Sequence, residues 1–168
     1  GMSVPDTVRH GAAKVIFESY PIVGYNYRMT DIQAAIGREQ LKRVPEVVAR
    51  RRKIADRYTA LLAGNAGIEA PTEPSYARSN WQSYCVRLPN NVDQKAVMQA
   101  MLDAGIATRR GIMCAHREAP YGGRSDATLA RSESAQDECI ILPLYAQMTS
   151  DEQDTVVETL KQSCLVNA

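Results

Sequence analysis

The sequence predicts a mixed α/β domain, an α+β layer in which helices cover a sheet of about three strands. Three observations predict this class. Segments with apolar residues at helical spacing are interspersed with short, strand-like apolar runs. Capping-box signals stand before the first and the last of the long helical segments. The chain has 168 residues, 45% of them hydrophobic, which suits one soluble domain with a real core.

The N-terminal segment, residues 1–23, is predicted to be irregular. Its compact apolar run, Val15 to Phe17, could form a short strand. Residues 24–168 carry the strong helix and strand signals, so we expect the domain proper to begin at residue 24.

Two consecutive helices follow and form one long, slightly broken element. The first begins after Thr30, because Thr30 and Gln33 have the spacing of a capping box, and it runs to about Val44. Pro45 suits the first turn of the second helix, and Gly64 suits its C-terminal end.

The rest of the chain alternates strands and helices after a loop at 65–80 that is rich in Gly, Pro, Ser and Asn. Alternating apolar residues and helical periodicity predict strands at 81–88, 106–110 and 139–142, and helices at 93–104 and 126–137. Thr149 and Glu152 form a second capping box that opens the last helix. The pattern leaves the direction of the strands open.

Bulk composition excludes several classes of protein. The net charge of +1 gives no argument for nucleic acid or a membrane surface as partner, and no apolar run reaches the length of a membrane span. Two histidines and four widely spaced cysteines without a C-x-x-C pair do not predict a metal centre. Free thiols without a secretory signal predict a cytoplasmic protein.

The loop Tyr25-Asn26-Tyr27-Arg28 is the first candidate site. It gathers an amide, a guanidinium and two tyrosines just before a helix start, which suits an anionic ligand such as a phosphate. The alternative is a helix entry whose tyrosines pack and whose Asn26 satisfies local backbone groups.

Three further polar groups have two interpretations each. The run Arg50 to Lys53 could contact nucleic acid, but nearby acids favour a solvated helix face. Arg109-Arg110 could hold a substrate phosphate or simply solvate the end of a strand. His116 with Glu118 could do acid–base work, but without a neighbouring nucleophile a substrate hydrogen bond or a plain surface histidine is favoured.

The chain resembles the DegT/DnrJ/StrS-type PLP-dependent sugar aminotransferases from about Gly24 to Leu160. The most specific block is Gly24-Tyr25-Asn26-Tyr27-Arg28-Met29-Thr30-Asp31-Ile32-Gln33-Ala34-Ala35-Ile36-Gly37, continuing with Gln40-Leu41. Later matches are the helix after Arg50, the strand 81–88, Gly105-Ile106, the His116 loop, and Ser134 to Leu144.

The resemblance implies a small C-terminal domain of the type I aminotransferase fold, in an enzyme that is a homodimer. It implies that Asn26, with Tyr25 and Arg28 beside it, contacts the phosphate of pyridoxal 5'-phosphate (PLP) bound by the partner subunit. It also implies that His116, Tyr121 and Arg110 face the substrate. The reaction implied is amino transfer from an amino acid, often glutamate, to a keto sugar on a nucleotide, a step of polysaccharide biosynthesis.

One departure from the family pattern limits what this chain is expected to do alone. The family's Schiff-base lysine precedes the Gly24 block, and Lys14, the lysine found there, does not match its motif. We therefore expect the C-terminal portion of a transaminase, natural or truncated, without catalytic residues and without turnover of its own. The alternative is a non-catalytic binding or dimerisation module with the same fold, and a nucleic-acid module ranks behind both.

Overall fold

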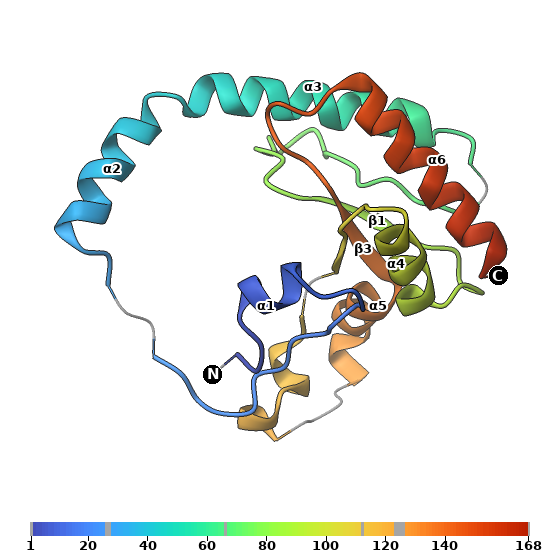
Figure 1. Ribbon diagram of the computed structural model, residues 1–168, viewed down its shortest axis with the longest axis horizontal. Helices are drawn as coiled ribbons and strands as arrows, with labels where there is room; N and C mark the ends of the chain where they lie inside the picture. Colours follow the sequence, from blue (N-terminus) through green and yellow to red (C-terminus); the bar gives the residue numbers. More distant parts are fainter. Residues whose placement is uncertain (1, 26–27, 66, 112, 123–126, 168) are drawn as a thin grey trace.

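The computed structural model describes residues 2–25, 28–65, 67–111, 113–122 and 127–167. Six α-helices and three strands lie in this part of the chain (Figure 1): α1 Asp6–His10, α2 Asp31–Leu41, α3 Val44–Leu62, β1 Tyr84–Arg87, α4 Gln94–Asp103, β2 Arg109–Arg110, α5 Ala130–Glu138, β3 Cys139–Leu142 and α6 Ser150–Val166. The predicted α+β class, with helices covering three strands, is confirmed.

The sheet is antiparallel, with the order β1-β3-β2. The last strand in the chain is thus the central one, with Val86 on one side and Arg110 on the other both opposite Ile140. Alternate residues of β1 and β3, such as Val86 and Leu142, are fully or almost fully buried on one face.

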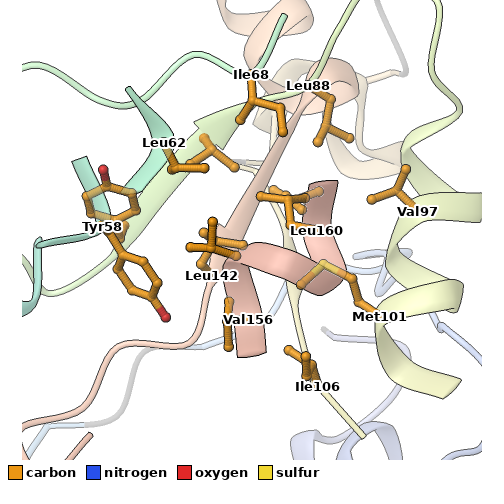
Figure 2. Packing of buried hydrophobic residues seen from close by; sticks show 14 of the residues in the cluster. Tyr58, Leu62, Ile68, Leu88, Val97, Met101, Ile106, Leu142, Val156 and Leu160 are labelled. Carbon is orange, nitrogen blue, oxygen red and sulfur yellow. The ribbon is translucent and has the colours of Figure 1, made fainter. Parts of the chain in front are cut away.

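The core lies between that face and the helices α3, α4 and α6. α6 packs against both α3 and α4. Figure 2 shows Leu160 of α6 and Met101 of α4 close to Leu142, with Tyr58 of α3 at the far side. Tyr58 is fully buried and its hydroxyl donates to the carbonyl oxygen of Pro143 at 2.9 Å. Burying each such side chain contributes roughly 1.5–3 kcal/mol to the stability of the fold.

The predicted capping signals are present, although α2 ends at Leu41 rather than near Val44. Both capping boxes are present: the backbone N–H of Gln33 donates to the Thr30 hydroxyl at 3.3 Å, and that of Glu152 donates to Thr149 at 3.2 Å. Gly64, just beyond α3, has a φ of +74°, a left-handed conformation that favours glycine at a helix end.

Several boundaries differ from the prediction. The segment predicted as irregular contains the short helix α1, while Val15 to Phe17 form no strand. The strand expected over 106–110 is reduced to Arg109 and Arg110. The helix expected from residue 126 is α5, which begins at Ala130 after a 3-10 turn at Ala127–Leu129; residue 126 itself lies outside the described residues.

The helix α2 stands apart from this core. None of its residues is buried, and Figure 1 shows it extending away from the sheet at the N-terminal end of α3. α3, by contrast, buries Ile54, Ala55, Tyr58 and Leu62. The predicted pair of helices therefore has two different environments, one solvent-facing and one packed.

Candidate functional site

The loop before α2 is open to solvent. Tyr25 is 88% exposed, Arg28 is also exposed, and Asn26 and Tyr27 lie outside the described residues. Arg28 has no hydrogen-bond or ion-pair partner among the residues that the structure describes. At the start of α2, the Gln33 N–H donates to the Thr30 hydroxyl, and that hydroxyl donates to Oε1 of Gln33. Arg28 is therefore the more available donor for an anion here.

The second candidate loop follows β2 and is held by short 3-10 turns at Ala115–Arg117 and Ala119–Tyr121. Gly111 begins it because the chain passes very close to α5: a Cβ there would clash with the carbonyl oxygen of Ala135. The Gly111 N–H donates to the Cys139 carbonyl at 2.7 Å. The loop therefore has a fixed start against the end of α5.

Half-buried His116 faces α5 rather than the loop before α2. Its Nε2 lies 2.9 Å from Oε1 of Glu133, and Arg117 contacts the same carboxylate at 3.2 Å. Arg117 also donates two hydrogen bonds of 2.8 Å to Asp137, and these bonds, with the bond to Glu133, raise the pKa of the guanidinium. The His116 Nδ1 atom has no hydrogen-bond partner in the described ranges, so it is the ring nitrogen available to a ligand.

Glu118 and Tyr121 of this loop meet the segment that leads to Tyr25. Oε2 of Glu118 accepts from the Tyr20 N–H at 2.8 Å. Beside this contact, a groove of about 370 Å³ runs between the residues 20–24 and the residues 113–121, with Tyr121 in its lining. The structure thus brings Tyr121 next to the approach to the Tyr25–Arg28 loop.

The other two predicted substrate residues line different cavities. His116 lines a hollow of about 430 Å³ against α5, which shares Met113 and Ala115 with the Tyr121 groove. Arg110 lines a separate cleft of about 190 Å³, where its guanidinium carbon lies 4.7 Å from the centre of the Phe17 ring. Among the described residues, Arg110, Tyr121 and His116 therefore line three different cavities and do not share one pocket.

Other chemistry is sparse in the part of the chain that the structure describes. It holds no group of three or more His, Cys, Asp or Glu arranged to bind a metal, and no helix long and apolar enough to cross a membrane. The four cysteines are unpaired, and burial raises the pKa of Cys85 to about 12 and that of Cys164 to about 11. The thiols of Cys85 and Cys164 are therefore poor nucleophiles at neutral pH.

Sequence reasoning missed the acidic partners on α5. Glu133 and Asp137 are four residues apart and so lie on one helix face, opposite His116 and Arg117. The spacing could have predicted that both acids lie on one face of α5. Which residues they contact, however, depends on how α5 packs against the loop. Sequence reasoning also missed Thr108, whose buried hydroxyl lacks a partner in the described ranges.

Comparisons with known proteins agree with this fold. The family model described as "DegT/DnrJ/EryC1/StrS aminotransferase family" matches residues 5–161. A GDP-perosamine synthase of Caulobacter vibrioides is 34% identical over 147 residues, which cover 85% of this chain and 39% of that protein.

Two solved structures are similar in both fold and sequence. The aminotransferase TlmJ of Streptoalloteichus hindustanus has a TM-score of 0.74 and 28% identity, covering 90% of this chain and 41% of that one. Spr1654 of Streptococcus pneumoniae, in its PMP-form, has a TM-score of 0.75 and 25% identity, covering 89% and 39%. The chain thus spans about two fifths of the length of the relatives it matches.

Proposed function

Because the chain belongs to the DegT/DnrJ/EryC1/StrS aminotransferase family, we propose that it provides the small-domain part of a PLP-dependent sugar aminotransferase. The reaction is transfer of an amino group from an amino acid to a keto sugar carried on a nucleotide. The GDP-perosamine synthase name of one relative supports the sugar class, in keeping with a role in polysaccharide biosynthesis. The four unpaired cysteines of the present chain suit a reducing cytoplasm.

The groove between residues 20–24 and 113–121 is the observation that carries the proposal. It joins the substrate loop to residues 20–24, which lead to the segment that the family resemblance assigns to the cofactor, and Glu118 holds the two together by accepting from the N–H of Tyr20. A substrate in this groove would therefore contact Tyr121 on a surface that also includes Gly24, the residue that precedes the cofactor segment.

In this proposal Asn26, Tyr25 and Arg28 contact the phosphate of PLP held by a second subunit. The exposed, unpartnered guanidinium of Arg28 fits a phosphate approached from outside the chain. PLP, when bound, supplies the electron sink for amino transfer. His116 would meet the substrate through Nδ1, Tyr121 through its ring or hydroxyl, and Arg110 through a phosphate group.

The lysines of this chain do not fit a covalent PLP site. Such a lysine needs a shielded position that lowers its pKa. Four of the five are exposed and one is half-buried on α6; they are Lys14, Lys42, Lys53, Lys95 and Lys161. We propose that the isolated chain forms no covalent adduct with PLP and has no turnover.

Borohydride trapping tests this point directly. The chain is incubated with PLP, reduced, digested and examined by mass spectrometry, with a full-length relative as the positive control. We expect stoichiometric labelling of one lysine in the relative alone. Labelling of one lysine of this chain at stoichiometric yield would refute the proposed division of labour.

Complementation tests the function itself. The lysine-bearing N-terminal portion of the 34%-identical relative is mixed with this chain, and amino transfer from glutamate to a nucleotide keto sugar is measured. Activity that requires both parts, and that falls with Arg28→Gln and with Tyr121→Phe, supports the proposal. Lys53→Gln, on an exposed helix position remote from the groove residues, is the control variant.

A second copy of this chain is the partner we propose for α2. Its apolar face, formed by Ile32, Ala35 and Ile36, is exposed, and both isoleucines are large enough to anchor an interface. A phosphate contact made in trans also requires two subunits. The same face supports the second candidate, a non-catalytic dimerisation module, which is favoured if complementation gives no activity while the dimer forms.

A further inference from the structure

The cleft around Arg110 is separate from the Tyr121 groove and has a well-defined wall. It lies between the segment 14–18, the edge strand β2 and α4. The side chain of Gln99 on α4 fastens the segment: it accepts from the Val15 N–H at 2.9 Å and donates to the Ala13 carbonyl at 3.1 Å. The cleft is thus bounded on both sides by anchored backbone.

The charges around the cleft are unequal. Four basic residues and one acid line it. The acid, buried Glu18, lies 2.9 Å from Arg109 and 3.5 Å from Arg9, so its charge is already engaged. Lys14 and Arg110 have no carboxylate partner within the residues that the structure describes. Two cations therefore remain for a ligand, in a cleft whose net charge is positive.

Two polar atoms at the wall also lack partners. The hydroxyl oxygen of Thr108 and Nε of Arg110 are both buried without a hydrogen bond among the described residues. Thr108 directly precedes β2, and both residues line this cleft. A buried polar group without a partner destabilises the fold, so such groups usually have a bound partner.

The Phe17 ring positions the guanidinium. The ring centre is 4.7 Å from the guanidinium carbon of Arg110, while Lys95 approaches the same ring at 5.9 Å from outside the cleft lining. Stacking on an aromatic face leaves the edge N–H groups of an arginine free to donate in the ring plane. Arg110 is therefore held in one orientation without using its donors on the protein.

We propose that this cleft binds an oxyanion, and specifically a phosphoryl group. A dianion gains from two cations more than a monoanion does, and tetrahedral oxygens reach donors on different walls, Lys14 on one side and Arg110 with Thr108 on the other. The inference deepens the proposed substrate role of Arg110 and rests on it for the biological source of the group, a nucleotide sugar. The cleft itself is assigned from this chain's own charges.

Calorimetric titration of the 168-residue chain with inorganic phosphate, pyrophosphate and 2-oxoglutarate, at constant ionic strength in chloride, tests the cleft without any turnover. We expect saturable phosphate or pyrophosphate binding. Arg110→Gln and Lys14→Gln should each weaken it about tenfold, the loss of one charged hydrogen bond. The control Lys95→Gln removes an equal charge beside Phe17 but outside the cleft, and should leave binding unchanged.

Three results would overturn the proposal: no saturable binding of phosphate or pyrophosphate, equal weakening in Lys95→Gln, or tighter binding of 2-oxoglutarate than of either phosphate. Circular dichroism of each variant checks that the fold is retained. If calorimetry finds no phosphate binding, the transaminase proposal still stands, because complementation tests it separately. If phosphate binds but complementation gives no activity, the cleft proposal stands and the transaminase proposal fails.

Discussion

The exposed apolar face of α2 should drive association of two chains, and Ile36→Ser should weaken it. Ile36 is 59% exposed. Burying that fraction of an isoleucine is worth about 1–2 kcal/mol, from a full value of about 1.5–3 kcal/mol. In a symmetric dimer each substitution occurs twice, so the loss is about 2–4 kcal/mol, or roughly 30- to 700-fold in the dissociation constant.

Sedimentation equilibrium across a wide concentration range measures this constant for the parent chain and the variant. The matched control is Leu165→Ser, which removes a side chain that is 75% exposed on α6, far along the chain from α2. We expect the control to dimerise like the parent. A parent chain that stays monomeric at the highest concentration, or a variant that dimerises equally well, would refute the argument.

Three further predictions concern stability, each measured by denaturant unfolding. Tyr58→Phe should destabilise by about 1–3 kcal/mol, because the carbonyl of Pro143 loses its buried donor; the unfolding midpoint should not change if that hydrogen bond is immaterial. Gly111→Ala should destabilise the fold by about 1–3 kcal/mol, since the added Cβ would overlap the backbone oxygen of Ala135 on α5. A variant as stable as the parent would show that the loop can shift to relieve this overlap. Hydrogen bonds from a guanidinium on α3 and from a backbone N–H lower the pKa of Glu73 to about 2, so its stabilising contribution is complete above its ordinary pKa of 4.5 and is lost as pH falls from there towards 2. Glu73→Gln should therefore show a shallower loss of stability over that interval, and an identical acid profile would count against this assignment.

Features that depend on neighbours in sequence were predictable. The two capping boxes need only residues three apart, as with Thr30 and Gln33, so tertiary packing does not change them. The strand β3 was equally clear, because its apolar run Cys139 to Leu142 has no competing helical period.

Features that depend on distant partners were not predictable. The segment Val15 to Phe17 has the composition of a strand. The backbone N–H of Val15, however, donates to the side chain of Gln99 rather than to a neighbouring strand, and the segment joins no β-ladder. Antiparallel pairing of β3 with both neighbours is likewise non-local, and the pattern left the strand direction open.

The candidate site divides along the same lines. Spacing placed Tyr121 in a polar loop, whereas its groove with residues 20–24 arises only from folding. The sequence could not identify Glu133 as the partner of His116, because that contact depends on how α5 packs against the loop. The roles proposed for Asn26 and Arg28 come from the family pattern, and they stay predictions.

The central place of β3 has a consequence for how this chain can be cut and how it is made. β1 and β2 have no ladder with each other in the described sheet. Apart from a single bridge between Arg87 and Glu69, each of them pairs with a strand that leaves the ribosome after both. Until Cys139 to Leu142 emerge, two edges with unpaired backbone groups stay open to neighbouring nascent chains. Fragments that end before Cys139 should therefore precipitate.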